Sequence, residues 1–337
     1  MLLTCQAGFE SLLARELALA GAPAVESGPG WTRTEVEAET GAMAFPWLTL
    51  KAPVEIRAES VNALAQRIAE VFSASLKGER IEAAWPSVWL GPPEIVGLGR
   101  RIKSVEDAFG ELLKKKLSRV AKLAVADIPR GVGAGRGLFV YFPDFGRAFV
   151  TREALVHGQR RMADDELAPS RSYLKVEEAY ILLGRGPEAG ETVCDLGAAP
   201  GGWSFSAAKR GARVVAIDNG PLKGGALDHP AIAHRMEDAF RFAPQAGEKF
   251  DWLFCDLVEE PHHVIQDIVA PWLANRWCER FVINLKFGRV DAVALLRELQ
   301  ADASPLVQHA PGFRVRHLYH DREEFTVVGQ VAGKSGR

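Results

Sequence analysis

Residues 195–203 read D-L-G-A-A-P-G-G-W, the end of an apolar strand that runs into a glycine-rich turn and then into a helix. Small residues at a strand-to-helix junction let a ligand approach the backbone closely. The spacing departs from G-x-G-x-x-G, because Ala199 stands where a nicotinamide enzyme needs glycine and Pro200 has no amide for a pyrophosphate. The turn therefore predicts a ligand site other than a dinucleotide site, and its competing interpretation is a structural turn without ligand.

The residues around this turn alternate between strand-like and helix-like segments. We expect strands at 192–195, 213–218, 250–256 and 281–285, and a helix from Trp203. This alternation predicts a Rossmann-like, doubly wound α/β domain with a parallel sheet. Two apolar runs near the end of the chain, 313–319 and 324–331, predict an antiparallel hairpin, which on a parallel sheet resembles the class I methyltransferase fold.

The chain before residue 170 has a different organisation. Residues 1–47 predict a small α/β unit with a strand at 1–5 and a helix at 8–20, and residues 48–155 predict a second α/β domain. The stretch 151–169 is polar and loses periodicity, so we place the main linker at 156–169. The ligand-binding domain is then expected at 170–337.

Composition limits the class of protein. The chain has 337 residues, of which 47% are hydrophobic and 25% charged, as in a globular protein. It has no apolar run long enough to span a bilayer, and charged residues interrupt the N-terminus too early for a signal peptide, so we expect a soluble cytoplasmic protein. The four cysteines are far apart and include no C-x-x-C pair, which predicts neither a metal site nor disulfides.

Charge is distributed unevenly along the chain. The net charge is −2, which argues against a general polyanion binder. Residues 95–136, however, hold ten basic side chains against four acidic ones, a local excess of about six positive charges. Lys114, Lys115 and Lys116 alone could be a solvated helix face, whereas the whole window favours contact with phosphates. We call residues 95–136 the basic window.

Carboxylates follow the predicted strands of the C-terminal domain. Asp218 stands 23 residues after Asp195 and ends the next strand, where a carboxylate can accept hydrogen bonds from a ribose diol. Asp238 follows the third strand position and could take the amino group of an adenine. A turn cap is the competing interpretation for Asp218, and helix capping for Asp238.

Several motifs in the C-terminal half resemble one enzyme family. The turn D-L-G-A-A-P-G-G-W resembles the cofactor loop of FtsJ-type 2′-O-ribose methyltransferases. Closer still is the resemblance to the bacterial large-subunit rRNA cytidine 2′-O-methyltransferases, carried by S-R-S-Y-L-K-V-E-E-A (170–179), A-I-D-N-G-P-L (216–222), C-D-L-V-E-E-P (255–261), N-L-K (284–286) and L-Y-H-D-R-E-E (318–324). These motifs cover residues 170–324.

The resemblance implies S-adenosylmethionine as cofactor, large-subunit rRNA or its assembly precursor as partner, and ferredoxin-like and THUMP-like RNA-binding parts in the N-terminal half. Ala199 stands where relatives often carry cysteine, and a backbone contact should survive that change. The residues that we expect to bind the cofactor are Ser172, Asp195, Gly197, Ala199, Pro200, Gly201, Gly202, Asp218, Asp238 and Asp256.

The resemblance also implies a Lys-Asp-Lys-Glu tetrad. Its positions here are Lys175, Asp256, Lys286 and Glu324. A ribose hydroxyl is a very weak acid, so methyl transfer to it needs a base or a cation that stabilises the developing alkoxide. We assign Lys286 as base, Lys175 as the cation that lowers its pKa, Asp256 as its orienting partner and Glu324 as a positioning residue. Glu323 is the rival of Glu324.

Other functions remain open from sequence. Base methylation is disfavoured, because no N-P-P-Y-like loop follows the fourth strand and no Pro-Cys occurs. His262 with His263, and His317 with His320, lack a convincing third metal ligand. A non-catalytic rRNA-binding assembly factor, or a methyltransferase for another RNA, is the alternative to an rRNA 2′-O-methyltransferase.

Overall fold

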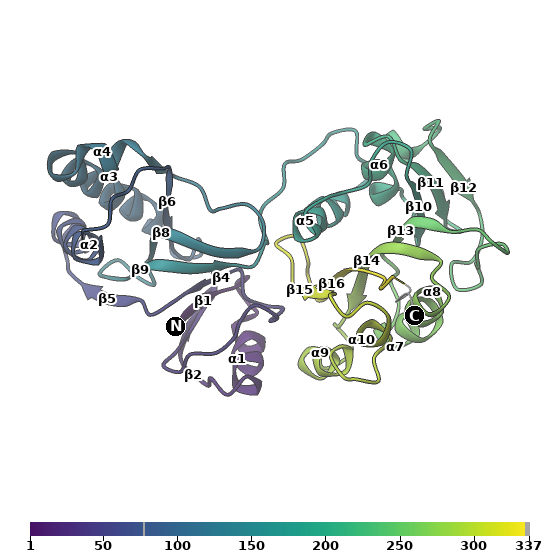
Figure 1. Ribbon diagram of the computed structural model, residues 1–337, viewed down its shortest axis with the longest axis horizontal. Helices are drawn as coiled ribbons and strands as arrows, with labels where there is room; N and C mark the ends of the chain where they lie inside the picture. The colour runs from purple at the N-terminus through teal and green to yellow at the C-terminus, as the bar shows by residue number, and fades with distance from the viewer. Residues whose placement is uncertain (77, 334–337) are drawn as a thin grey trace. The chain divides into compact units, whose positions relative to one another are not determined.

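The structure is a computed structural model that describes residues 1–76 and 78–333 (Figure 1). The chain divides into two units: Met1–Gly41 with Phe45–Gly158, called the N-terminal unit, and Ala42–Ala44 with Gln159–Arg337, called the C-terminal unit. The last four residues of the domain expected at 170–337 lie outside the described residues. We describe each unit by itself.

The N-terminal unit is built on one mixed sheet. Its strand order is β2-β3-β1-β4-β9-β8-β6-β7, and β5 pairs with β9 beside β4. Its elements are β1 (Leu2–Thr4), α1 (Glu10–Leu19), β2 (Ala24–Gly28), β3 (Trp31–Thr34), β4 (Leu48–Leu50), β5 (Val54–Arg57), α2 (Val61–Leu76), β6 (Trp85–Leu90), α3 (Leu98–Lys116), α4 (Ser118–Lys122), β7 (Ala124–Val125), β8 (Gly133–Tyr141) and β9 (Arg147–Val156). Because β1 pairs with both β3 and β4, one sheet joins the two parts expected at 1–47 and 48–155.

Apolar spacing explains the two long helices of this unit. In α3, Leu98, Ile102, Val105, Phe109 and Leu113 recur every three or four residues and are buried. The buried residues of α2 have the same helical spacing, and both sets belong to one core cluster with strand residues of β6, β8 and β9. This apolar stripe turns the basic side chains of α3 toward solvent.

The polar stretch from residue 151 was partly misread from sequence. The loss of periodicity at Thr151 suggested the start of a loop, but β9 continues to Val156 and pairs with β4 and β8. Pairing on both sides stabilises this strand although its side chains are mixed in polarity. Neither helix nor strand occurs between His157 and Ser172.

The C-terminal unit is a seven-stranded sheet of order β12-β11-β10-β13-β14-β16-β15, in which β10 to β14 are parallel and β16 is antiparallel. Its elements are α5 (Tyr173–Leu183), β10 (Thr192–Leu196), α6 (Gly202–Lys209), β11 (Arg213–Ile217), the 3-10 turn η1 (Gly224–Ala226), β12 (Ile232–Arg235), β13 (Phe250–Cys255), α7 (Pro261–Val264), the π-helical turn η2 (Ile265–Val269), α8 (Ala270–Ala274), β14 (Cys278–Lys286), α9 (Ala292–Leu299), α10 (Pro305–His309), β15 (Arg314–Arg316) and β16 (Glu324–Gln330). The predicted doubly wound sheet and its terminal hairpin are confirmed.

Both faces of this sheet are covered. Trp252 and Phe254 of β13 pack against α5 and α6, whereas Leu253, which points to the opposite face, is equally buried. Figure 1 shows α5 and α6 on one side of the strands and α7 to α10 on the other. Burial on both faces explains the continuous apolar strand sequences. Because β10 to β14 are parallel, their polar carboxyl ends lie at a single edge of the sheet.

Two further observations concern membranes and metals. No helix within residues 1–76 and 78–333 is long and apolar enough to cross a membrane. In the same residues no three or more His, Cys, Asp or Glu side chains gather into a possible metal site. All four cysteines are buried free thiols.

Candidate active site

Four charged side chains meet at the carboxyl edge of the C-terminal sheet. Lys286 Nζ donates to Asp256 Oδ1 at 2.5 Å and also contacts Glu324 Oε2. Lys175 Nζ lies 2.5 Å from Glu324 Oε1 and 3.8 Å from Asp256 Oδ2. The structure therefore brings the four expected tetrad residues together, with the Glu324 carboxylate between the two lysines.

Strand register fixes this arrangement. Lys286 is the last residue of β14 and Glu324 the first residue of β16, and the two are directly opposite in the antiparallel pair. Cross-strand neighbours have side chains within contact distance, so the ion pair follows from the register. Asp256 comes directly after β13, the parallel neighbour of β14. The ends of β13 and β14 and the start of β16 thus supply three of the four tetrad residues.

A buried carboxylate holds the fourth member, Lys175, near the sheet. Glu178 lies one helical turn after Lys175 in α5 and accepts backbone hydrogen bonds from Arg160, Tyr319 and His320 at 2.8 to 3.2 Å. These bonds tie α5 to the segment between β15 and β16. Burial raises the pKa of Glu178 well above its usual value, although the three amide donors oppose that shift.

The electrostatics of Lys286 differ from the expectation from sequence. Burial alone would lower the pKa of its ammonium group, but the Asp256 and Glu324 carboxylates outweigh burial and raise that pKa above its usual range. From the sequence we expected Lys175 to lower the pKa of Lys286. The sequence did not show that the Asp256 and Glu324 carboxylates both contact the Lys286 ammonium group. The two lysines balance the two carboxylates in charge, and Lys286 is held as an ammonium in the free protein.

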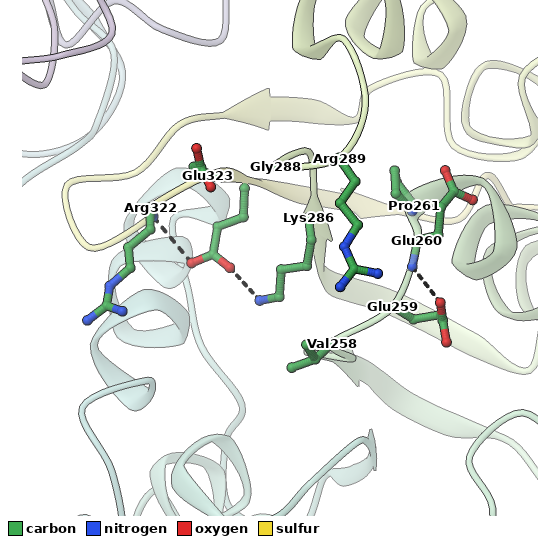
Figure 2. Close-up of a pocket in the computed structure, with 10 residues that line it drawn as sticks. Val258, Glu259, Glu260, Pro261, Lys286, Gly288, Arg289, Arg322 and Glu323 are labelled. Atoms are coloured by element: carbon green, nitrogen blue, oxygen red, sulfur yellow. Dashed lines mark hydrogen bonds and ion pairs between the residues drawn. The ribbon is translucent and has the colours of Figure 1, made fainter.

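A cavity of about 410 Å³ opens beside Lys286. Figure 2 shows its lining: Lys286 lies between the side chains of Arg289 and Arg322, and Val258 points in from below. The loop after β13 and the start of α7 supply residues 258–261. The end of β14 with the loop after it, and the start of β16 with the loop before it, supply the rest. Among the tetrad, Lys286 and Glu324 line this cavity, so a bound substrate would reach them directly.

The glycine-rich turn lies beside the tetrad strands. Gly197 and Gly201 have positive φ angles of 78° and 105°, which favour glycine. A Cβ at Gly201 would lie 2.4 Å from Ala226 Cβ, and one at Gly197 would lie 2.7 Å from Leu257. The peptide between Ala199 and Pro200 is cis. These residues are therefore small because the backbone is tightly folded at the site.

Two of the expected cofactor residues hold the turn in place. Asp218 accepts hydrogen bonds from the Ala199 amide at 2.9 Å and from the Gly220 amide at 2.6 Å. The Asp218 carboxylate thus caps a turn, which was the alternative to a ligand contact in the sequence analysis. It also anchors the glycine-rich segment. Ser172 lies against the start of α6, because a Cβ at Gly202 would lie 2.9 Å from its Oγ.

Asp195 and Asp238, two further residues expected at the cofactor, each have a partner within the protein. Asp195 is 1% exposed and accepts a hydrogen bond from Ser204 Oγ at 2.6 Å, so its carboxylate supports α6 from below. Burial raises its pKa to about 7. Asp238 is exposed and accepts from the Phe240 amide at 2.9 Å, which is a local cap. Neither carboxylate bonds to another expected cofactor residue.

Sequence reasoning missed the two arginines of the cavity. Arg322 lies within the quoted L-Y-H-D-R-E-E motif, and Arg289 follows N-L-K by three residues. Their closeness in sequence to Lys286 and Glu324 was the available signal. The histidines once considered for metal have other partners: His262 lies between Glu260 and Glu298, and His263 stacks on Phe240 at 4.3 Å between ring centroids.

Comparison with known proteins gives a consistent set of relatives. Residues 168–293 match the family model described as FtsJ-like methyltransferase. A protein of Laribacter hongkongensis named ribosomal RNA large subunit methyltransferase M is 35% identical over 74% of this chain and 72% of its own length. One of the same name from Halorhodospira halophila is 33% identical over 100% of this chain and 98% of its own length.

The bridge made by Glu324 leads to a prediction on stability. Glu324→Gln should lower the free energy of unfolding by about 3–5 kcal/mol, because it leaves the nearly buried Lys175 without its closest counter-charge. The neighbouring Glu323 is exposed and belongs to no ion pair that the described residues show, so Glu323→Gln should change the free energy by no more than about 0.5 kcal/mol. Denaturant unfolding measures both. Equal effects of the two substitutions would contradict the assignment of Glu324.

Proposed function

The chain belongs to the ribosomal RNA large subunit methyltransferase M family, and from this premise we propose that it transfers a methyl group from S-adenosylmethionine to the ribose 2′-oxygen of a cytidine in large-subunit rRNA. The observation that carries the proposal is the contact of Lys286 with Asp256 and Glu324 at the edge of a cavity. A ribose hydroxyl needs such a group because it is very weakly acidic.

The turn at 197–202 fits S-adenosylmethionine. It follows β10 at the carboxyl edge of the sheet, where doubly wound sheets bind ligands, and Gly197, Ala199 and Pro200 are only partly buried there. When bound, the cofactor supplies the electrophilic methyl group and one positive charge. We propose that Asp218 accepts from its ribose, exchanging the bonds that it now receives from Ala199 and Gly220, and that Ser172 and Asp238 lie beside the same ligand.

We propose the following division of work in the tetrad. Lys286 faces the cavity, orients the 2′-hydroxyl and accepts its proton once its ammonium has lost a proton to solvent. Asp256 and Glu324 fix the direction of its Nζ. Lys175 keeps the Glu324 carboxylate in place from the side of α5. Placing a cationic cofactor near Lys286 would oppose the raised pKa, since like charges favour the neutral amine.

The first test replaces the proposed base. Lys286→Ala should lower methyl transfer to protein-free large-subunit rRNA by at least about 100-fold while cofactor affinity stays nearly constant, because general bases contribute roughly that much. Lys175→Ala should inactivate as well, and Lys249→Ala, an exposed lysine outside the cavity, should not. Label transfer and calorimetry measure the two effects. Near-normal turnover of Lys286→Ala, or cofactor binding without transfer by the unaltered protein, would contradict the proposal.

The second test concerns pH. If Lys286 acts as base, turnover rises with pH as its ammonium deprotonates, and the carboxylates that raise its pKa place that rise at alkaline pH. Asp256→Asn removes one of them and should move the midpoint to lower pH, whatever its effect on the maximal rate. Glu279→Gln, an exposed carboxylate at the other end of β14, should leave the midpoint in place. An unmoved or higher midpoint in Asp256→Asn would contradict the role of Asp256.

We propose that the N-terminal unit adds RNA affinity through the basic window, in keeping with the THUMP-like and ferredoxin-like parts that the resemblance implies. The structure divides this window. Lys103 pairs with Glu106 and Asp107, and Lys114 pairs with Glu111. Lys115, Lys116 and Arg119, at the end of α3 and in α4, are exposed and have no ion pair that the described residues show. These three are the better candidates for phosphate contact.

A salt series tests this surface. The triple substitution of Lys115, Lys116 and Arg119 by alanine should weaken rRNA binding and flatten its log–log salt dependence by about 2, since each phosphate contact to a single strand contributes roughly 0.7. The double substitution of Lys103 and Lys114, whose charges are already paired, should change the slope little. Equal slopes for the triple variant and the unaltered protein would remove these residues from the RNA-binding surface.

A further inference from the structure

Two guanidinium groups lie on either side of Lys286 at the cavity. Arg289 is three residues after the end of β14, and Arg322 is two residues before the start of β16. Both are exposed and both line the cavity that contains Lys286 (Figure 2). The backbone of Arg322 is fixed to the tetrad, because its amide donates to Glu324 Oε1 at 3.3 Å. The positions of the two arginines are thus tied to the strands that carry the catalytic residues.

Neither guanidinium has a counter-ion. Within residues 1–76 and 78–333, no ion pair joins Arg289 or Arg322 to a carboxylate, although four glutamates line the same cavity. The other arginines that face acidic neighbours in this unit are paired, as Arg185 is with Glu191 and Arg210 with Glu177. Two cations are therefore free to bind an anion at the site of the reaction.

Two of the four glutamates that line the cavity, Glu324 and Glu260, have other partners. Glu324 contacts the two lysines, and Glu260 contacts His262 and caps α7. Glu323 lies over the backbone of Gly288, where a Cβ would be 2.8 Å from its Oε2. The glutamates form no ion pair with the two arginines, so an entering polyanion is attracted at Arg289 and Arg322 and repelled by the glutamates.

We propose that Arg289 and Arg322 form a clamp for the two RNA phosphates that flank the target nucleotide, which places the ribose between them at Lys286; this inference rests on the proposed function. Guanidinium groups bind phosphate oxygens in a bidentate geometry, which restricts orientation as well as adding affinity. Contacts to phosphates position a nucleic acid without reading its bases. The clamp therefore positions the RNA backbone, and base identity is read elsewhere.

The experiment measures rRNA binding over a salt series and methyl-transfer kinetics for Arg289→Ala, Arg322→Ala and the double variant. Each single variant should reduce the salt slope by about 0.7 and the double variant by about 1.4. The KM for rRNA should rise at least about tenfold in the double variant, since hydrogen bonds between charged groups are strong. Both residues are exposed, so thermal unfolding should be unchanged.

Two sets of variants serve as controls. Arg297→Ala removes an exposed arginine of α9 that does not line the cavity, and it should leave the salt slope and the KM in place. The double substitution to lysine keeps both charges and loses the bidentate geometry, so the salt slope should return to that of the unaltered protein. The KM should return only in part.

The possible results separate this inference from the proposed function. If the double alanine variant keeps the salt slope and the KM of the unaltered protein, or if Arg297→Ala matches its loss, the clamp is wrong. A second outcome is that nucleoside analysis finds the methyl group on a base while the double alanine variant still shows a reduced salt slope of rRNA binding. In that case the proposed ribose specificity fails and the phosphate clamp stands. A loss of affinity for only one base sequence would show base reading and would overturn the clamp.

Discussion

The Glu324 carboxylate, placed between two lysines, is the interaction on which the site depends. One of its oxygens contacts Lys175 of α5 and the other contacts Lys286 of β14. A nearly buried carboxylate is costly alone, and two partly buried ammonium groups would repel each other without it. The three groups stabilise one another only when α5, β14 and β16 are all in place, so assembly of the site requires completion of the fold. The Glu178 and Asp321 carboxylates, both buried, hold the connecting segment through backbone amides.

The fold of the C-terminal unit was predictable because its signals are local. Apolar strands alternate with helices along the chain, which indicates the doubly wound sheet. The small residues at 197–202 indicate a tightly folded turn. The meeting of Asp256 with Lys286 was predictable for the same reason, since parallel strands end at one edge of the sheet. The strand 151–156 was missed because its stability comes from pairing with β4 and β8, which no local pattern reports.

Side-chain environment was the part that sequence reasoning could not supply. The pKa of Lys286 depends on how many carboxylates contact its ammonium group, and that number follows from the pairing of β14 with both β13 and β16. The sequence did not show that Asp195 is buried and accepts a hydrogen bond from Ser204 of α6. In the sequence Arg289 and Arg322 are ordinary loop residues, and only the structure shows that they line the same cavity as Lys286. The sequence also could not show that Glu324, and not Glu323, contacts the two lysines.

The central claim is that the methyl group goes to a ribose oxygen, and the most direct measurement is the chemical position of that group in the product. Large-subunit rRNA incubated with the unaltered protein and labelled S-adenosylmethionine is digested completely to nucleosides, which are then separated and weighed by mass spectrometry. The account predicts label in 2′-O-methylcytidine, and an adjacent phosphodiester that resists alkali. Label on a base, with every phosphodiester cleaved by alkali, would contradict it.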